Sequence, residues 1–463
     1  MASLTDSSRL SGISGSSSVI TDPVKLAAYQ IGGRIPAVVV RPRASEEVAE
    51  IVKFAGAERL AIVPTGARTK FSMGMPPRQY DLALDMTQLD RLIAYDPGDL
   101  TLGVEAGTPL QKIAGVLAEH RQFLPLSVPF LSLATIGGTI ASGVDTPLRQ
   151  YYGTARDYLL GTEFVTSEGL LAKSGGRVVK NVTGYDIHKL MVGALGTLGV
   201  ITKINFRTFP LPGATRAFVA LFETAKSALD LRHLVARSPL TPLTIEILSP
   251  RAAELFSGHV AAQIEPAPIP RTLFSPSHWA FTTSFAGNQQ MLERYERDLL
   301  QMAEQSGAIR AAVLAETDLT GALGRTREFI PIALACSEAT TIVKVVLLPS
   351  RVSESLEDMA RAAETNSLGW AALVRGLGVI YLALLPSDGE ENTLGRVQKA
   401  TDQVLAETSA RGGNATIPWC PGKWKSGLRV WGLERGDLEQ MRRLKHVFDP
   451  RGVLSPGRFV GGL

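Results

Sequence analysis

Residues 180–201 read KNVTGYDIHKLMVGALGTLGVI, and this stretch says more about the fold than any other part of the chain. Its first half predicts a short helix that ends near Leu190. Gly196 and Gly199 then mark the return of the chain into an apolar strand that begins at Val200. The stretch therefore predicts a helix, a tight turn and a strand in direct succession.

Three further motifs precede this stretch, and a fourth closes the chain. A turn after an apolar strand reads PTGARTK (64–70), a glycine-rich segment reads ATIGGTIASG (134–143), and a third motif reads YGTARD (152–157). The closing motif reads FDPRGVLSPGRF (448–459). Any one of these glycine-containing segments alone is more often ordinary tight packing than a cofactor site, so only their ordered combination indicates a cofactor.

In this order and spacing, over residues 36–210, the motifs resemble the flavin-binding core of the FAD-linked oxidases related to vanillyl-alcohol oxidase, the PCMH-type superfamily. Within that superfamily, RVVKN (177–181) and the PGRF ending (456–459) most resemble the FAD-binding subunits of glycolate oxidases. The resemblance implies an α+β fold, with a PCMH-type FAD-binding domain of two α+β subdomains and a cap domain built on an antiparallel sheet.

We predict four segments along the chain. Residues 1–21 are rich in Ser and Gly and are expected to form a flexible tail that adds nothing to the core. The FAD-binding domain is expected at 22–212, where it ends in a stretch with two prolines, and the cap domain at 213–412. Residues 413–463 are expected to return to the FAD-binding domain.

Hydrophobic periodicity predicts the first elements of both domains. Apolar strands are expected at 37–40 and 60–63, with a helix between them for which Ser45 suits the N-cap position. In the cap, strand-like and helical segments alternate, which predicts an antiparallel sheet with helices on one face.

FAD presents a pyrophosphate, an apolar ring system and an adenine, and each needs a different protein surface. Small residues in the turn at 64–70 would let backbone N–H groups point at the pyrophosphate oxygens. The helix expected to begin near Thr135 would add further N–H donors, and Val200 and Ile201 could flank the adenine. The predicted residues for non-covalent FAD binding are Pro64, Thr65, Gly66, Ala67, Arg68, Thr69, Lys70, Pro129, Thr135, Ile136, Gly137, Gly138, Ala141, Ser142, Gly143, Gly153, Ala155, Arg156, Asp157, Gly199, Val200 and Ile201.

The turn at 64–70 departs from the resembled family at Ala67 and Arg68, where relatives usually carry consecutive glycines. A non-glycine residue at positive φ costs about 1 kcal/mol or more, so the turn is expected to be reshaped. Arg68 is expected either to pair with the pyrophosphate or to occupy its place. The turn contains no His, so no histidyl-flavin bond is predicted there.

Several conspicuous side chains have structural interpretations beside functional ones. Arg156 and Asp157 are expected to form a structural ion pair, with the backbone of Arg156 near the flavin. Lys180 and Tyr185 fit solvated and core side chains at least as well as direct roles in the chemistry. Three tryptophans lie within residues 419–431, where core packing is the more common explanation and an interface the alternative.

Bulk properties limit the class of protein. A chain of 463 residues can form two or three domains with a substantial core. A net charge of +4 is too small to argue for nucleic acid as a partner. Cys336 and Cys420 are the only cysteines, which predicts no disulfide framework, structural zinc or iron–sulfur centre in this chain. No apolar run is long enough to span a bilayer, so we expect a cytoplasmic protein that reaches the inner membrane only through partners.

The oxidation of a 2-hydroxy acid needs a cation for the carboxylate and a base for the hydroxyl proton. Arg325, Arg327 and Arg375 in the cap are candidate cations, and no catalytic residue is assigned. Some relatives bind a metal with the cap motif His-Gly-Asp-Gly-Asn-x-His, which this chain lacks. Its six histidines show no metal-ligand spacing, so no metal is predicted.

The resemblance implies an FAD-dependent oxidoreductase that acts on CH–OH groups. It further implies a subunit of a glycolate (2-hydroxy acid) dehydrogenase complex, in which electrons pass from the flavin to an iron–sulfur subunit and a related flavoprotein subunit is also present. Two alternatives stay open. One is a structural or regulatory subunit with weakened FAD binding, motivated by Arg68, and the other is a stand-alone flavin alcohol oxidase.

Overall fold

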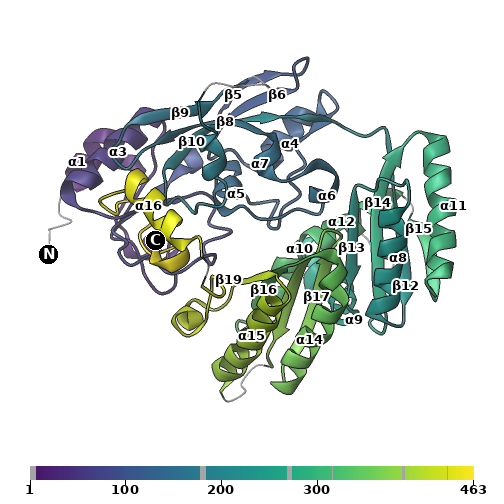
Figure 1. Ribbon diagram of the computed structural model, residues 1–463. Coiled ribbons are helices and arrows are strands. Elements are labelled where there is room, and N and C mark those ends of the chain that lie inside the picture. The colour runs from purple at the N-terminus through teal and green to yellow at the C-terminus, as the bar shows by residue number, and fades with distance from the viewer. Residues whose placement is uncertain (1–6, 178–183, 268–273, 315, 388–391, 435) are drawn as a thin grey trace.

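The computed structural model describes residues 7–177, 184–267, 274–314, 316–387, 392–434 and 436–463. Lys180, Asn181, Val182 and Thr183, at the start of the stretch quoted above, lie outside the described residues. Figure 1 shows the N-terminal half of the chain, in purple to blue, beside a second body in teal to green. The C-terminal end, in yellow, lies against the N-terminal half, from which it is distant in the sequence.

A four-stranded sheet forms the first of two α+β subdomains. Its strands lie in the order β1 (Val19–Ile20), β2 (Val38–Val40), β4 (Leu82–Asp85) and β3 (Ile62–Thr65), and α2 (Pro23–Ala27) precedes β2. β2, β4 and β3 are parallel, and α3 (Ser45–Glu58) connects β2 to β3. The three valines of β2 are all buried, as expected for a parallel strand covered on both faces.

The N-terminal residues correct one prediction. Residues 7–20 do not form a tail outside the core, because α1 (Ser7–Ser14) buries Leu10 against the first sheet and α3. β1 pairs with β2 antiparallel and so covers an edge of the parallel strands. The Ser- and Gly-rich composition hid a few apolar residues at useful spacing, and those residues are enough to dock the segment.

Ser45 also differs from its predicted role. Ala44 occupies the N-cap of α3, and Ser45 is the first helical residue. The Ser45 hydroxyl donates instead to Oε1 of Glu163 at 2.8 Å, and Lys203 lies 2.9 Å from the same carboxylate. Ser45 therefore ties α3 to the second subdomain, a tertiary contact that local sequence does not reveal.

The second subdomain carries a five-stranded antiparallel sheet. The strand order is β5 (Leu92–Asp96), β6 (Thr101–Glu105), β10 (Val200–Arg207), β8 (Leu159–Val165) and β9 (Leu171–Gly175). Its helices are α4 (Leu110–Ala118), α5 (Ile136–Ser142), α6 (Arg149–Tyr152) and α7 (Ala155–Tyr158), and a short ribbon joins β7 (Gln122–Phe123) to β11 (Phe209–Pro210). Because α3 contacts β8, β9 and β10, it lies between the two sheets and joins the subdomains.

The cap is an eight-stranded sheet in which all neighbouring strands are antiparallel. Its order is β15 (Arg310–Leu314), β12 (Ala214–Phe222), β14 (Trp279–Gly287), β13 (Thr244–Leu248), β17 (Gly369–Arg375), β18 (Val379–Leu385), β16 (Thr341–Val346) and β19 (Asn414–Trp419).

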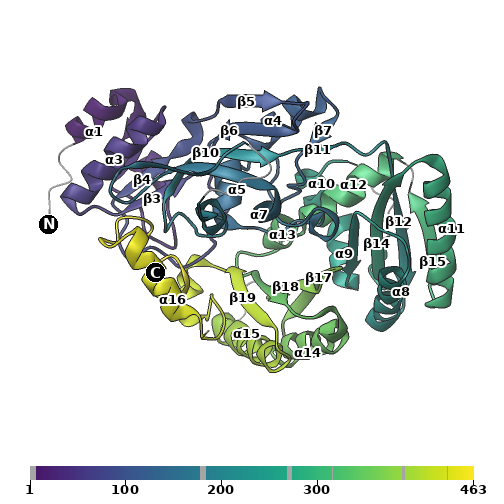
Figure 2. The same ribbon diagram turned by 45° about the horizontal axis from the view of Figure 1, so that its top comes forward.

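Helices cover both faces of this sheet, whereas the sequence predicted one face. The face turned away from the FAD-binding subdomains, which we call the outer face, packs on α8 (Ala225–Arg237), α11 (Gln289–Gln305), α14 (Val352–Thr365) and α15 (Thr393–Ala410). The inner face packs on α9 (Pro250–Ser257), α10 (His259–Ile264), α12 (Glu316–Arg327) and α13 (Phe329–Leu334). Figure 2 shows α10, α12 and α13 on the side of the sheet that faces the FAD-binding subdomains predicted above.

The C-terminal segment completes the cap before it returns. β19 pairs with β16 at the edge of the cap sheet, so the sheet includes residues beyond the predicted boundary at 412. After α16 (Leu438–Phe448), the chain lies beside β3. There the Ile62 N–H donates to the Val453 carbonyl at 2.7 Å, and the Ser455 N–H donates to the Ile62 carbonyl at 2.8 Å.

Candidate functional site

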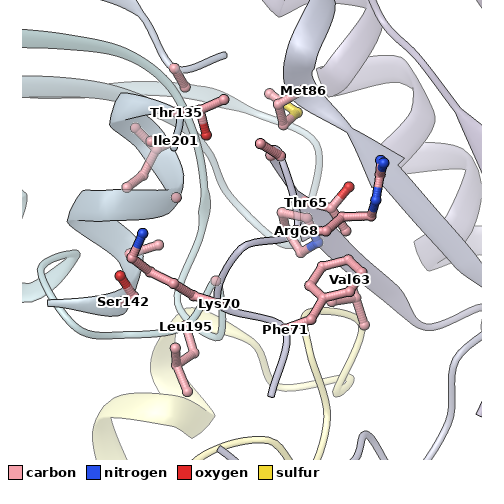
Figure 3. Close-up of a pocket in the computed structure, with 18 of the residues that line it drawn as sticks. Val63, Thr65, Arg68, Lys70, Phe71, Met86, Thr135, Ser142, Leu195 and Ile201 are labelled. Carbon is pink, nitrogen blue, oxygen red and sulfur yellow. The ribbon is translucent and has the colours of Figure 1, made fainter. Parts of the chain in front are cut away.

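A cavity lies between the two N-terminal subdomains, and we call it the cofactor cavity. Figure 3 shows the turn after β3, α5 and the segment before β10 converging on it. The sequence-predicted residues that line it are Pro64, Thr65, Gly66, Ala67, Arg68, Thr69, Lys70, Thr135, Gly137, Gly138, Ala141, Ser142, Gly199 and Ile201. Residues from three of the four early motifs are therefore brought to one place.

The turn after β3 and the start of α5 touch one another at Gly66. A Cβ atom on Gly66 would lie far inside contact distance of the Thr135 hydroxyl oxygen, so only glycine fits there. Gly137 is equally constrained, because a Cβ atom there would lie 2.7 Å from the carbonyl oxygen of Ala106. These glycines let the turn, α5 and β6 approach closely enough to form one continuous backbone surface.

This surface fits an anion. In the described part of the chain, the backbone N–H groups of residues 66–70 donate no backbone hydrogen bond. The hydroxyl of Thr135 is also buried there without a hydrogen-bond partner. Buried polar groups normally have partners, so a run of free donors beside the start of a helix indicates a ligand with acceptor oxygens. A pyrophosphate has those oxygens, and the residues present therefore fit FAD.

Arg68 adopts a positive φ of 63°, so the turn keeps a left-handed residue at this position although a reshaped turn was expected. Its guanidinium lies 4.5 Å from the centre of the Tyr29 ring and 4.0 Å from the Asp85 carboxylate. Figure 3 shows this side chain directed away from Lys70 and Ser142. Arg68 therefore leaves the centre of the cofactor cavity open, which argues against the expectation that it occupies the place of the pyrophosphate.

Lys70 extends from the same turn to the opposite wall, on the side of Ser142 (Figure 3). Its ammonium group is buried, lies 3.5 Å from the Pro129 carbonyl oxygen, and lies 5.9 Å from the centre of the Phe130 ring. Burial lowers the pKa of Lys70 to about 8, and the negative charge of Glu328 opposes that shift. A buried cation that lines the cofactor cavity can stabilise negative charge on a bound group.

Arg458 also lines the cofactor cavity, although it was not among the predicted site residues. Its Nη2 donates to the carbonyls of Phe71 and Met73 at 3.2 and 2.7 Å, while Nη1 is buried without a partner. Burial lowers the pKa of Arg458 to about 10. The signal was present in the closing motif, where the PGRF sequence was recognised but assigned no role. The other lining residues that were not predicted are Val63, Phe71, Met86, Ala106, Leu195 and Gly196.

Some predicted residues support the cofactor cavity without lining it. Pro129 receives the Lys70 hydrogen bond, and Ile136 and Val200 are fully buried in the core. Gly143 ends α5 in a left-handed conformation with φ 58°, and its α-carbon faces Gly193. These four residues fix the backbone on which the lining residues stand.

The segment around α7 lies outside the lining of this cavity, and the predicted ion pair there is wrong. Asp157 accepts hydrogen bonds from the N–H and hydroxyl of Thr154, at 2.6 and 2.8 Å, in a capping box. Arg156 donates to the Lys189 carbonyl instead, at 3.4 Å. Gly153 takes φ 82° beside Asp157, and Ala155 begins the helix.

Tyr185, for which a core position was one interpretation, is 91% exposed.

A second cavity lies between the end of α5 and the cap, and we call it the interface cavity. It shares Ser142 with the cofactor cavity, so the two meet at that residue. Its lining comes from the N-terminal subdomains and from the cap and C-terminal segment: Met73, Gly74, Ser142, Gly143 and Val144 on one side, and Lys344, Tyr381, Thr416, Pro418, Trp419, Val430 and Trp431 on the other.

Buried charges stand beside the interface cavity on the inner face of the cap sheet. Arg375 lies opposite Glu246 in the β13–β17 pair, 3.5 Å from its carboxylate and 3.4 Å from that of Asp145. Burial opposes the charge of Arg375, but the negative charges of Asp145 and Glu246 outweigh it and raise the pKa of Arg375. Of the three candidate cations, Arg375 is thus the one near this cavity, and its charge is already paired.

Arg325 and Arg327 are held elsewhere. Arg325 donates to the carbonyls of Phe256 and Ala267, and Arg327 lies 2.6 Å from Glu265 and 2.9 Å from Glu328. Both arginines therefore stabilise the inner helices of the cap and do not line either cavity.

The described residues contain no group of three or more His, Cys, Asp or Glu side chains arranged to hold a metal ion. No helix within the described ranges is both long and apolar enough to cross a bilayer.

Fold and site together define an FAD-dependent oxidoreductase with a two-part cofactor domain and a cap. The FAD binding domain family matches residues 36–175, and the C-terminal domain family of FAD linked oxidases matches residues 211–459. The chain belongs to the FAD-linked oxidases. These matches confirm the predicted superfamily, the enzyme class and FAD as the cofactor.

Individual relatives agree with that assignment. The chain is 24% identical to the glycolate oxidase subunit GlcD of Bacillus subtilis, over 92% of this chain and 89% of that protein. It is 37% identical to the glycolate oxidase subunit GlcE of Escherichia coli, over 37% of this chain and 49% of that protein. Its fold is similar to that of p-cresol methylhydroxylase, with a TM-score of 0.78 and 18% identity over 97% and 95% of the two chains. This likeness confirms the predicted fold class.

Proposed function

We propose that this chain is a redox-active subunit of a 2-hydroxy-acid dehydrogenase complex, with glycolate as the expected substrate and FAD held non-covalently. The observation that carries the proposal is the meeting of two cavities at Ser142. One cavity offers backbone donors to a pyrophosphate, and the other offers polar side chains beneath the cap. A cofactor in the first and a small polar substrate in the second would meet at this junction.

FAD, when bound, supplies the acceptor for the hydride that leaves the CH–OH carbon. The protein contributes binding, orientation and charge. The turn at 64–70 and the start of α5 would hold the pyrophosphate. Glu328, at the start of α13, accepts hydrogen bonds from the N–H groups of Phe130 and Leu131 at 2.7 and 3.2 Å, which joins the cap to the wall beside Lys70.

The electrons are expected to leave through a partner. Cys336 and Cys420 are the only cysteines of the chain, too few for an iron–sulfur cluster of its own. The relatives from Bacillus subtilis and Escherichia coli are both named as glycolate oxidase subunits. The proposed complex therefore contains a related flavoprotein subunit and an iron–sulfur subunit, and it lies in the cytoplasm, attached to the inner membrane through these partners.

The visible absorption spectrum of the purified chain tests the proposal. The spectrum is recorded before and after anaerobic addition of glycolate or D-lactate, and the flavin released by denaturation is identified. FAD bands that bleach with a hydroxy acid would support a redox-active subunit and identify its substrate. FAD that stays oxidised with both acids, also in the presence of the co-purified partner subunits, would contradict the proposal.

A structural subunit with weakened FAD binding is the second candidate, and Arg68 is the observation that favours it. The contacts of Arg68 with Asp85 and Tyr29 speak against it, because they keep the guanidinium aside. A colourless protein that takes up no FAD from excess cofactor, yet still binds its partners, would establish this second function. Turnover with oxygen in the absence of partners would instead indicate a stand-alone alcohol oxidase.

A further inference from the structure

Lys344 stands in the interface cavity at a position that the strand register fixes. On β16 it lies directly opposite Tyr381 of β18 on one side and Thr416 of β19 on the other. All three side chains line the cavity. Neighbours on the same face of a sheet point the same way, so the pairing gathers an ammonium, a phenol and a hydroxyl at one site.

The ammonium of Lys344 has no acidic partner. In the described part of the chain it makes no hydrogen bond or ion pair, and its nearest aromatic ring, that of Tyr381, has its centre 5.9 Å away. The side chain is only partly accessible, and burial lowers the pKa of Lys344. A cation in such a place is costly unless a negative charge approaches it.

Asp145 is the acidic group whose negative charge favours the charged form of Lys344, but that carboxylate is already shared with two arginines. Asp145 lies 3.4 Å from both Arg149 and Arg375, and Arg375 also pairs with Glu246. The two carboxylates thus balance the two arginines, and the positive charge of Lys344 is not balanced by a further acidic group. A monovalent anion in the interface cavity would balance the group.

Two indole N–H groups belong to the same cavity. Trp419 and Trp431 line it, and the Nε1 atom of each is buried without a hydrogen-bond acceptor. By contrast, Nε1 of Trp370 donates to the Glu364 carboxylate at 3.3 Å on the outer side of the cap. A buried donor without a partner is unfavourable, and a bound acceptor would remove that cost.

We propose that Lys344, with the indole N–H groups of Trp419 and Trp431, binds the carboxylate of the substrate. A carboxylate carries one negative charge and about four acceptor positions, which match one ammonium and two N–H donors. The inference rests on the proposed function for the identity of the acid, but the anion site stands on the geometry alone. Because the interface cavity meets the cofactor cavity at Ser142, the hydroxyl-bearing carbon would lie on that side.

Binding of oxalate to the full-length flavoprotein tests this site without turnover, because oxalate has no C–H bond to oxidise. Oxalate carries two carboxylates, and one of them takes the place of the substrate carboxylate at the site. Affinity is measured by isothermal titration calorimetry, with uncharged glycolamide as the control ligand. We expect oxalate to bind and glycolamide to bind at least tenfold more weakly. Lys344→Met should weaken oxalate binding at least tenfold, and Lys344→Arg should restore most of the loss.

The tryptophans are tested with Trp419→Phe and Trp431→Phe, which remove the N–H and keep a ring. Each is expected to weaken oxalate binding about threefold or more. Matched controls are Lys399→Met, on the exposed surface of α15, and Trp370→Phe, on the outer side of the cap. Both controls should bind oxalate as the unchanged protein does.

Unchanged oxalate affinity in a folded, FAD-containing Lys344→Met protein would overturn the site. If that variant does not fold, Lys344→Gln and Trp431→Phe decide the question by the same measurement. The two proposals fail separately. If oxalate binding depends on Lys344 but neither glycolate nor D-lactate bleaches the flavin, the proposed function is wrong and the anion site stands. If glycolate bleaches the flavin but oxalate affinity does not depend on Lys344, the proposed function stands and the anion site is wrong.

Discussion

The cofactor cavity takes its shape from backbone, whereas the interface cavity takes its chemistry from side chains on separate strands. In the first, Gly66 and Gly137 allow a turn, a helix and a strand to touch. In the second, Lys344, Tyr381 and Thr416 come together only because three strands are in register. A site made of backbone tolerates changes of charge but not of volume, and a site made of buried charges should respond in the opposite way.

Removing a buried charge beside the interface cavity should have the largest effect. Arg375→Met leaves Asp145 and Glu246 buried without their shared cation, and breaking a buried ion pair costs about 3–5 kcal/mol. Urea denaturation of the cap should show that loss in the free energy of unfolding. Arg251→Met, which breaks an exposed pair with Glu254, is the control and should change it by about 0.5 kcal/mol or less.

The same variant has an expected pH dependence. Burial raises the pKa of Glu246, and Arg375 opposes that shift. Without the arginine, the folded-state pKa of Glu246 rises further above its unfolded value. Stability is then retained at low pH and lost as pH rises, so the deficit should be larger at pH 8 than at pH 5. A deficit that is equal at both values would mean that Glu246 does not depend on this cation.

A volume change in the cofactor cavity should have the next largest effect. Gly66→Ala places a methyl group against the Thr135 hydroxyl, and overpacking of this kind costs about 1–3 kcal/mol. FAD affinity, measured by fluorescence titration of the apoprotein, should fall about tenfold to a hundredfold. Thr135→Ala in the same chain should restore part of the affinity, because it removes the hydroxyl that the methyl group meets.

Gly115→Ala is the matched control for this volume change. Gly115 lies in α4, and no atom lies within 4 Å of the position that its Cβ would take. It should leave FAD affinity unchanged. If the Gly66→Ala protein also binds FAD normally, the close approach of the turn to α5 does not determine the shape of the cofactor cavity. The statement that this cavity does not tolerate a change of volume would then be wrong.

The same contrast explains what the sequence could predict. Most residues of the cofactor cavity were found because backbone sites leave a local signature, namely glycines at fixed offsets after a strand or before a helix. Arg458 was overlooked although its motif was recognised, because the sequence does not say where a terminal segment docks. Ser45 was misassigned because a capping residue and a tertiary donor look alike in one dimension.

The interface cavity was beyond this kind of reasoning. The sequence suggested Arg325, Arg327 and Arg375 as cations for the substrate carboxylate. Which cationic side chain lacks an acidic partner can be recognised only when the structure shows the ion pairs that each one makes. Lys344 looks like an ordinary strand residue until the eight-stranded order places it between β18 and β19. Three tryptophans near the C-terminus were noticed, and their most common explanation, core packing, is compatible with two of them also lining a cavity.

Lys70 offers a test at the junction of the two cavities. Lys70→Met should still bind FAD but should lower its two-electron reduction potential by about 30–60 mV, which corresponds to about 1.4–2.8 kcal/mol. The reason is that a buried cation stabilises the negative charge gained on reduction. Spectroelectrochemical titration measures the potential, and exposed Lys112→Met is the control.

The pH dependence of that potential has a defined sign. Burial lowers the pKa of Lys70 to about 8, so the ammonium charge is present below pH 8 and lost above it. The difference in potential between the unchanged protein and Lys70→Met should therefore shrink as pH rises through 8. A difference that is constant from pH 6 to pH 9.5 would show that Lys70 does not act through its charge.

Arg68 should give the smallest effect and the sharpest test of the contrast. Arg68→Gly suits the observed φ of 63° and removes a guanidinium that Asp85 and Tyr29 hold aside. Relief of the left-handed conformation is worth about 1 kcal/mol, and the partly exposed ion pair contributes a similar or smaller amount, so stability should change little. FAD affinity should stay within about threefold of that of the unchanged protein, because backbone N–H groups line the part of the cofactor cavity that would bind the pyrophosphate. A loss of tenfold or more would mean that the guanidinium swings back to the pyrophosphate, and the cofactor cavity would then depend on a side-chain charge just as the interface cavity does.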